Sequence, residues 1–427
     1  MRFTAQGEWE SATIGVKHLP IAVRAPVLTV CDVERGGQYH PLLGVARMAD
    51  GAVNMALESG PLALKATLVL TPDGAAFKGK LRMVDTTGKD RGLLVRVSVP
   101  VNAIGWSWWD ELERSRAIAA DRLYEDVKPL RAFAALPEWK DKPDLRMGFN
   151  TENFCSVITG PSGLCLAVPL DQPRIFRTGY DARQRLFSIT YDVALCADTA
   201  PPAEAAFEFE LYGCDPAWGM RSALDIYYQR HPQFFAKNLK DEGMWVAFTR
   251  LDSIDNATEF GVRVQEGAGS VGYDDKIGAR SFNYYTHAGI YADVPDHKRG
   301  VDPTPSLERR IAAVEANLKR STGCDGSYAE CGLHDATGKL SAEPGTVYGD
   351  VLAQFCLEPE LFYGKWLLER IDQFFADQRK RGGELDGFYY DGLTTGINYR
   401  REHFQHVACP PWWDPVAKQP YLYNYFS

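Results

Sequence analysis

The sequence predicts a multidomain β plus α/β protein, in which an antiparallel β-sandwich is followed by a (β/α)8 barrel of the TIM type. Two observations lead to this fold class. Short strand-like runs between turn signals dominate the first half of the 427 residues, whereas strands and helices alternate from residue 243 onward. The length exceeds one ordinary domain. We therefore expect a galactose-mutarotase-like sandwich over 1–213, a helical connector over 214–242 and the N-terminal half of a catalytic barrel over 243–427.

The sandwich is predicted from apolar or alternating runs that are bounded by Gly, Pro and Asp. Runs of this length and spacing are typical of antiparallel strands that bury one face. The clearest ones cover residues 63–70, 93–99, 164–168, 186–191 and 207–212. In this half of the chain, helix is expected only near residues 110–121.

The connector and the barrel are predicted from changes in periodicity. Asp215 and Pro216 are suited to open a helix at 219–228, with Asp215 as its N-cap. No Gly/Ser linker follows, which favours a fixed interface between the domains. Beyond it we expect strands and two amphipathic helices in alternation. The strands are expected at 243–251, 280–287, 351–357 and 385–391, and the helices at 306–319 and 361–380.

The length of the second half predicts an incomplete barrel. A full eight-stranded barrel needs about 250 residues, and fewer than that follow Gly243 before the chain ends at Ser427. We therefore expect a barrel truncated after about four strands. The start at Met1 lacks the apolar run of a signal peptide. If the N-terminus is incomplete as well, the missing signal peptide carries no information, and a periplasmic or extracellular localisation is one of the alternatives that stay open.

Composition excludes several classes of partner. The net charge of −9 is spread along the chain, which argues against nucleic acid or an anionic membrane. No apolar run approaches the roughly 20 residues of a membrane span.

The cysteines form no CxxC pair. Cys324 and Cys331 flank a loop and could form a disulfide in an oxidising compartment, although an odd total of cysteines favours free thiols. His403 and His406 lie three apart, but a metal site there is the weaker interpretation. The oligomeric state stays open.

The segment 385–393 contains the main catalytic candidate. It is typical of a short buried strand that ends on Asp391 and turns at a glycine. Barrel enzymes place their catalytic groups at the C-terminal tips of strands. Because side chains alternate, Asp391 and Tyr389 would face the barrel axis. Phe388 and Tyr390 would then pack beneath the helices. The alternative is an aspartate that only caps the following turn.

Further candidates for substrate binding are aromatic or lie near the expected strand ends. Trp412 and Trp413 follow the Asp391 strand on a Pro-rich loop, and exposed rings of this kind suit the CH faces of sugars. Tyr285 and His287 end the second expected strand. Asp275 follows the first. The corresponding structural interpretations are a packed aromatic cluster, a rim histidine and a solvated acidic turn.

Three short motifs resemble a group of bacterial glycoside-hydrolase-like proteins. They cover residues 105–110, 170–174 and 215–219. These proteins combine an N-terminal galactose-mutarotase-like sandwich with a (β/α)8 barrel, and they are distantly similar to endo-α-N-acetylgalactosaminidases and α-galactosidases. The resemblance covers most of the chain. It implies that Asp391 is the strand-four nucleophile and that the acid/base lies on strand six, beyond Ser427.

The expected function is hydrolysis of a poly- or oligosaccharide with retention of configuration. Such hydrolysis needs two carboxyl groups about 5 Å apart, one to attack and one to donate a proton. It uses no cofactor or metal, and with strand six absent the chain alone is expected to be inactive. One alternative is a non-catalytic carbohydrate-binding protein on the same scaffold. Another is a metal-dependent hydrolase that uses Asp274, Asp275, Glu266 and His287.

Overall fold

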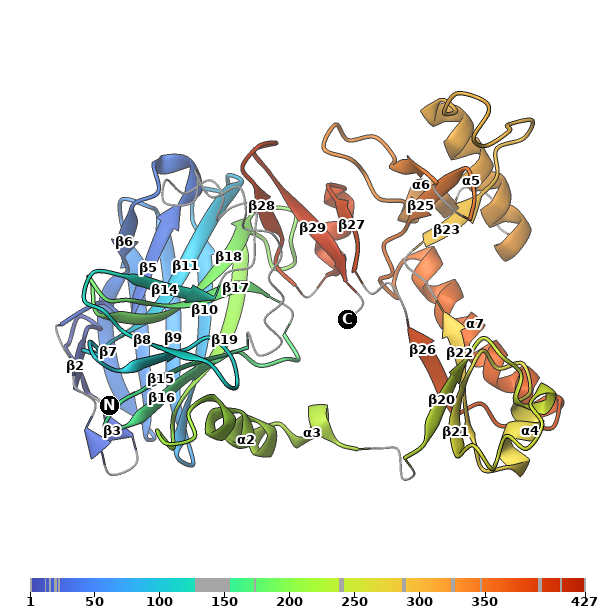
Figure 1. Cartoon of the computed structure of the whole chain (residues 1–427). Helices are drawn as coiled ribbons and strands as arrows, with labels where there is room; N and C mark the ends of the chain where they lie inside the picture. The colour runs from blue at the N-terminus through green and yellow to red at the C-terminus, as the bar shows by residue number, and fades with distance from the viewer. Residues whose placement is uncertain are drawn as a thin grey trace. The chain divides into compact units, whose positions relative to one another are not determined.

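The computed structural model describes two compact units (Figure 1). One unit comprises Met1–Ala236 and Val407–Leu422, and the other comprises Lys237–His406 and Tyr423–Ser427. The described residues are 2–11, 13–14, 17–18, 21, 24–126, 154–172, 174–237, 242–285, 289–323, 327–345, 348–390, 394–407 and 409–425.

The first unit is a sandwich of two antiparallel sheets (Figure 1). The larger sheet contains β7 (Leu43–Ala49), β8 (Ala52–Ser59), β9 (Leu64–Asp73), β10 (Ala76–Asp85), β12 (Ser107–Trp109), β13 (Ser115–Ala117), β15 (Cys155–Thr159), β16 (Gly163–Ala167) and β19 (Glu204–Cys214). The smaller contains β5 (Leu28–Asp32), β6 (Tyr39–Pro41), β11 (Arg91–Pro100), β14 (Leu123–Asp126), β17 (Ile175–Asp181) and β18 (Leu186–Leu195). Their orders are β13-β12-β15-β16-β19-β10-β9-β8-β7 and β14-β17-β18-β11-β5-β6. Short elements precede and join them, namely β1 (Arg2–Phe3), β2 (Trp9–Ser11), β3 (Thr13–Ile14), β4 (Lys17–His18) and η1 (Val33–Arg35).

The core lies between the two sheets and follows from strand alternation. On β11, Val95, Val97 and Val99 are buried between the sheets. Arg96 and Ser98 alternate with them and therefore belong to the outer face of the smaller sheet. The five strands expected from the sequence are all present, as β9, β11, β16, β18 and β19.

The outer face of β15, β16 and β19 is covered by α2 (Met220–Arg230), which explains why β15 and β16 are buried on both faces. Tyr227 of α2 donates a hydrogen bond to the carbonyl of Val168 at 2.9 Å. The helix lies close to the expected bounds, but its N-cap is Gly219, at φ 51°, and not Asp215. Asp215 instead accepts from the backbone N–H of Ala217 in the preceding turn. The short α3 (Pro232–Phe235) follows.

The helix expected near residues 110–121 is absent, and this expectation was wrong. Strands β12 and β13 pair there, with Ser107 opposite Ala117. Arg116 closes the hairpin with two hydrogen bonds to the carboxylate of Asp110, at 2.6 and 2.7 Å. Trp108 is buried in the sandwich core, which an alternating strand achieves and a helix at this site does not.

The second unit contains a parallel sheet in the order β20 (Met244–Ala247), β21 (Val262–Glu266), β22 (Arg280–Tyr285) and β26 (Gly387–Tyr390). The turn η3 (Leu251–Ser253) follows β20, and α4 (Val271–Lys276) joins β21 to β22. The long helix α7 (Phe362–Lys380) precedes β26, close to the expected bounds. The strand at β21 was not expected. The structure thus shows a four-stranded parallel sheet whose connections include α4 and α7. A closed barrel is not part of this description.

An antiparallel subdomain is inserted between β22 and α7. It contains β23 (Gly289–Ala292), α5 (Leu307–Thr322), α6 (Ser327–Cys331), β24 (Ala342–Pro344) and β25 (Val351–Gln354), with strand order β23-β25-β24. Ser306 caps α5 as its N-cap residue, and Gly323 ends it in the left-handed conformation at φ 77°. The strand expected at 351–357 therefore exists but belongs to this subdomain.

The chain after β26 continues through β27 (Thr394–Asn398) and η4 (Arg401–His406). It then forms a hairpin of β28 (Trp412–Asp414) and β29 (Gln419–Tyr425), with Trp412 opposite Tyr421. Strand β28 contacts β11 and β18, so this returning segment packs on the sandwich.

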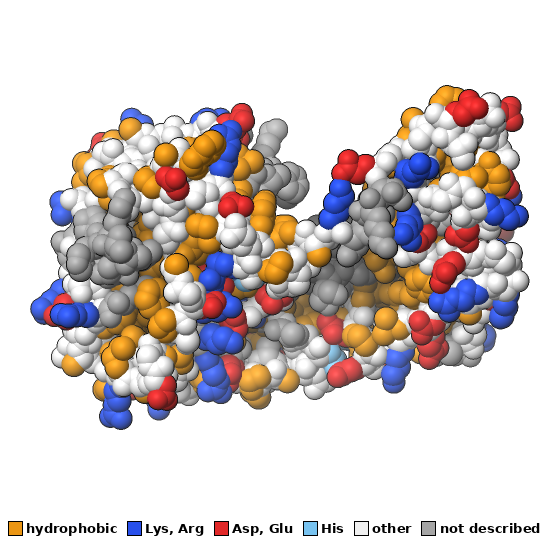
Figure 2. Space-filling view, turned by 90° about the horizontal axis from the view of Figure 1, so that it is seen from below, with side chains coloured by type: hydrophobic (Ala, Val, Ile, Leu, Met, Phe, Trp, Pro, Cys, Tyr) orange, Lys and Arg blue, Asp and Glu red, His pale blue; other side chains and the backbone are white. Residues whose placement is uncertain are grey.

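The surface charges and the cysteines do not single out a functional site. On the face seen in Figure 2, Lys and Arg side chains are interspersed with Asp and Glu in both units. No helix of the described part of the chain has the length and apolar character needed to cross a membrane. The considered pairing of Cys324 with Cys331 falls on Cys324, which lies outside the described residues.

Candidate functional site

The carboxyl ends of the parallel strands meet at one edge of the sheet. The last strand residues there are Ala247, Glu266, Tyr285 and Tyr390. Asp391 follows Tyr390 directly in the chain. Asp391 and His287 themselves lie outside the described residues, and so does the side chain of Tyr285, although its backbone pairs with Tyr390.

One face of this sheet carries a row of aromatic side chains, formed by Trp245, Tyr389, Tyr284 and Phe248. Ring centroids are 5.3 Å apart for Trp245 and Tyr389, and 6.0 Å apart for Tyr389 and Tyr284, which are stacked. Phe248 meets Tyr284 edge-on at 5.0 Å. Trp245 is 50% exposed, Tyr389 39% and Phe248 72%, so this aromatic row is open to a ligand.

The aromatic row shows that this face is concave. Trp245 lies on β20 and Tyr389 on β26, with β21 and β22 between them. Three strand spacings of about 4.8 Å put these positions about 14 Å apart on a flat sheet. Side chains stand roughly perpendicular to a sheet, so rings on a flat one would stay that far apart. Their separation of 5.3 Å indicates that the sheet curls toward this side.

The opposite face of β26 packs on helix α7. The ring of Phe388 lies 6.0 Å from that of Phe374 and 5.5 Å from that of Phe375. Tyr390 is on the same face and stacks on Phe388. The alternation expected from the sequence, with Tyr389 on one face and Phe388 on the other, is therefore present.

Glu266 adds a carboxyl group to the concave side. It is the last residue of β21 and is 1% exposed. Strand register pairs it with Phe282, which shares a face with Tyr284 and therefore with the aromatic row. From the sequence, Glu266 was expected only as a residue of the metal-dependent alternative. The sequence signal for it is an acid before a glycine at the end of a strand-like run, the same pattern that singled out Asp391.

Asp275 lies at the wrong edge of the sheet for a substrate-binding role. Helix α4 runs back along the sheet, so its last turn reaches the beginnings of the next strands. There the carboxylate of Asp275 accepts the backbone N–H of Glu384, which precedes β26, at 2.7 Å. The expectation that Asp275 lines the site is contradicted by this position.

Asp274 does not join Glu266 in a metal site. Its carboxylate accepts the hydroxyls of Ser270 at 2.8 Å and Ser281 at 2.7 Å. Burial raises the pKa of Asp274. Ser281 faces the helix side of β22, opposite to the face of Phe282 and Glu266. Within the described ranges, no group of three or more His, Cys, Asp or Glu side chains is arranged to hold a metal ion.

His403 is a structural residue. One ring nitrogen lies 2.9 Å from the side-chain amide of Asn398, and the other lies 2.9 Å from the carbonyl oxygen of Glu330. Both nitrogens are thus engaged. Burial lowers the pKa of His403 to about 4, so the ring is neutral at pH 7.

Trp412 and Trp413 are buried, at 2% and 3% exposure, which contradicts a role as open sugar-stacking surfaces. Trp413 covers Gly92 of β11 so closely that a Cβ there would come within 2.2 Å of the indole Cγ. Its indole N–H donates to Glu34 at 3.3 Å. The Pro-rich loop is fixed as well, because the carbonyl of Pro411 accepts the backbone N–H of Ala194.

Comparison of the sequence with protein-family models gives no match, and comparison with curated proteins gives none. The fold, in contrast, resembles solved structures of carbohydrate enzymes. A GH36 α-galactosidase from Geobacillus stearothermophilus, in complex with stachyose, matches 94% of this chain with 11% identity and a TM-score of 0.50. This chain spans 59% of the length of that enzyme.

Two further structures align less closely. An α-galactosidase from Lactobacillus brevis matches 86% of this chain and 53% of its own, with 10% identity and a TM-score of 0.42. A putative aldose 1-epimerase from Escherichia coli matches 40% of this chain and 69% of its own, with 11% identity and a TM-score of 0.23. The expected distant resemblance to α-galactosidases in fold is confirmed by the first match.

Proposed function

We propose that this protein is a retaining glycoside hydrolase, in which Asp391 is the nucleophile and the sheet β20-β21-β22-β26 supplies the first four strands of a (β/α)8 barrel. One observation carries the proposal. Asp391 directly follows Tyr390, the last residue of the fourth parallel strand, in the sequence. Tyr389 lies on the concave side that carries the open aromatic row, and we assign the Asp391 carboxylate to the same side because side chains two positions apart share a face of a strand. The likeness in fold to an α-galactosidase solved with stachyose supports an α-galactoside as the first substrate class to test.

We assign sugar binding to the aromatic row. Its open rings offer flat apolar surfaces to the CH faces of a pyranose, while Tyr389 also carries a hydroxyl group for a polar contact. Tyr285 pairs with Tyr390 and therefore belongs to the face that packs on α7, which corrects its expected role in sugar binding. We assign His287, which lies outside the described residues, to substrate hydroxyls. Glu266 is too buried to touch substrate and is assigned a positioning role at the same edge.

The proposed chemistry is a double displacement. The Asp391 carboxylate attacks the anomeric carbon, and the bond to the leaving-group oxygen breaks as that oxygen takes a proton from an acid. Water, deprotonated by the same group, then releases the sugar from the ester and regenerates the carboxylate. The acid/base residue remains unassigned. A test of Asp391 should therefore use a substrate whose leaving group needs no proton.

Fluoride is such a leaving group, so the first experiment is incubation with 5-fluoro-α-galactosyl fluoride. The fluorine at C5 slows hydrolysis of the ester, and the adduct is located by peptide mass spectrometry. We expect a glycosyl adduct on Asp391 in the unaltered protein and none in Asp391→Asn. Asp386→Asn is the matched control, since Asp386 immediately precedes the same strand and accepts the backbone N–H of Ser281. The control should retain the adduct.

An adduct on another residue, or one that persists in Asp391→Asn, would remove Asp391 from the mechanism. The open aromatic row also favours a second candidate, a carbohydrate-binding protein without turnover, because exposed rings alone suffice for binding. Sugar binding by calorimetry without adduct formation in any variant would favour that candidate.

A further inference from the structure

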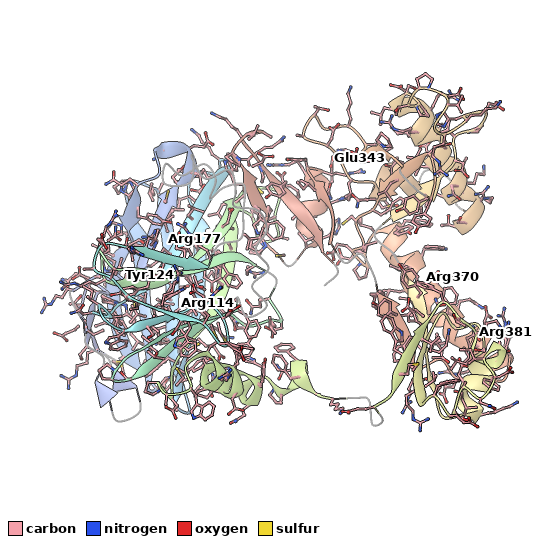
Figure 3. The ribbon with its side chains drawn as sticks, in the orientation of Figure 1. Arg114, Tyr124, Arg177, Glu343, Arg370 and Arg381 are labelled. Carbon is pink, nitrogen blue, oxygen red and sulfur yellow. The ribbon has the colours of Figure 1, made fainter. Side chains whose placement is uncertain are left out.

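A polar cavity lies on the outer face of the smaller sandwich sheet. Its volume is about 140 Å³, and strands β6, β11, β14, β17 and β18 contribute to its lining. Strand register aligns Arg96, Thr190 and Arg177 in one row across this face. Tyr39 and Glu125 complete the lining on either side, and Arg177 is labelled in Figure 3 among the strands of the sandwich.

The two arginines of the cavity differ in their partners. Arg177 is 3% exposed and forms an ion pair with Glu125, with an N···O distance of 3.0 Å. Arg96 stacks on Tyr39, its guanidinium carbon 3.5 Å from the ring centroid. Its Nε is buried without a hydrogen-bond partner among the described residues, as is the hydroxyl of Tyr39. The Arg96 guanidinium therefore has a buried donor that no described residue engages.

The Arg96 Nε–H and the Tyr39 hydroxyl can each form a hydrogen bond to a bound ligand. A buried donor without a partner is costly, and the fork of a guanidinium matches the two oxygens of a carboxylate. Glu125 and Asp181 also line the cavity, so a monoanion is favoured over a dianion such as phosphate. The volume equals about five waters at about 30 Å³ each, so the cavity admits the carboxylate and the adjoining hydroxyl groups of one sugar unit, whose remaining atoms would lie outside it. The hydroxyls of Ser188 and Thr190 suit a polyhydroxylated one.

We propose that this cavity binds one acidic sugar unit, with its carboxylate on Arg96 and its hydroxyl groups on Thr190 and the Arg177–Glu125 pair. This site lies within the first unit, and its ligand chemistry differs from that of the neutral galactoside proposed for the second. The sandwich would thus recognise a charged residue of a polysaccharide independently of hydrolysis.

The test is calorimetric titration of the full chain with galacturonate, with galactose and sodium sulfate as comparison ligands. We expect binding of galacturonate that is at least tenfold tighter than that of either comparison. Arg96→Met should weaken it at least tenfold, while the methionine still covers Tyr39. Arg47→Met removes an exposed arginine from the other sheet and should leave the affinity unchanged. Asp391→Asn should also leave it unchanged, which separates this site from the proposed catalytic one.

Several outcomes would overturn the proposal. They are absence of galacturonate binding, equal affinity for galactose, equal affinity for sulfate, and unchanged galacturonate affinity in Arg96→Met. Circular dichroism of the Arg96→Met variant checks that it is folded. If that variant is unfolded, Arg96→Lys keeps the charge without the fork, and it should still weaken galacturonate binding several-fold.

Discussion

Replacement of Trp413 by alanine distinguishes a packing role from a sugar-binding role for this residue. The indole is 3% exposed, lies on β28 and covers Gly92 of the sandwich. The substitution should open a cavity beside β11 and weaken the packing of the returning segment 407–422 on the sandwich. The sandwich should therefore lose stability, and sugar binding at the second unit should be unaffected.

The size of the loss can be worked out from the area that the side chain buries. A buried aromatic side chain removes about 150–250 Å² from water. At about 25 cal/mol per Å², this corresponds to about 4–6 kcal/mol, which is an upper value because the unfolded chain is itself partly compact. Measured losses for Trp→Ala in protein cores are about 3–5 kcal/mol. We expect a decrease of about 4 kcal/mol in the free energy of unfolding of the first unit.

The assay is urea unfolding followed by far-UV circular dichroism, beside titration with galactose and raffinose. Val416→Ala is the matched control, since Val416 belongs to the same hairpin and is 89% exposed. It should change the free energy of unfolding by less than about 0.5 kcal/mol. A loss below about 1 kcal/mol in Trp413→Ala, together with weaker sugar binding, would refute the packing role.

Three further predictions address other parts of the molecule. Trp245→Ala removes a half-exposed ring of the aromatic row, so calorimetry should show roughly tenfold weaker galactoside binding, and urea unfolding a loss under about 1 kcal/mol. His403 has a pKa of about 4 in the folded protein and about 6.5 when unfolded, so the unfolded state takes up the proton first as the pH falls. Stability that is fully present above pH 6.5 should decrease by about 3 kcal/mol toward pH 4, and His403→Gln should flatten this dependence in unfolding experiments. Arg91→Met leaves Asp32 and Asp85 buried without their shared cation, and thermal or urea unfolding should show a loss of about 3–5 kcal/mol at pH 7.

The sandwich could be predicted because its signal is local. Side chains at two-residue spacing share a face, and runs such as 93–99 alternate between core and outer positions in the sequence itself. The helices could be predicted for the same reason. The helical spacing of apolar residues in α7 and the capping residues of α5 are both recognised from residues that are close in the sequence. What these signals leave open is which strand pairs with which.

Strand pairing, which the sequence pattern does not determine, explains the wrong expectations for the second half of the chain. The apolar run at 351–357 was assigned to the barrel, but β25 pairs antiparallel with β23 and β24 in the inserted subdomain. Strand β21 was missed because Arg263 and Gln265 interrupt its apolar pattern. The two errors compensate, so β26 is still the fourth strand of the parallel sheet.

The candidate site shows the same division between local and distant information. An acid before a glycine at the end of a strand-like run, the pattern of Glu266 and of Asp391, can be recognised from a few residues, because the strand and the turn are both local signals. Whether an aromatic ring is open or buried depends on contacts far along the chain. Trp413 is buried by β11, more than 300 positions earlier, whereas Trp245 stays half exposed although nothing in its own segment distinguishes the two. The nucleophile is therefore the part of the proposed site that the sequence argues best, and the sugar-binding surface is the part that required the fold.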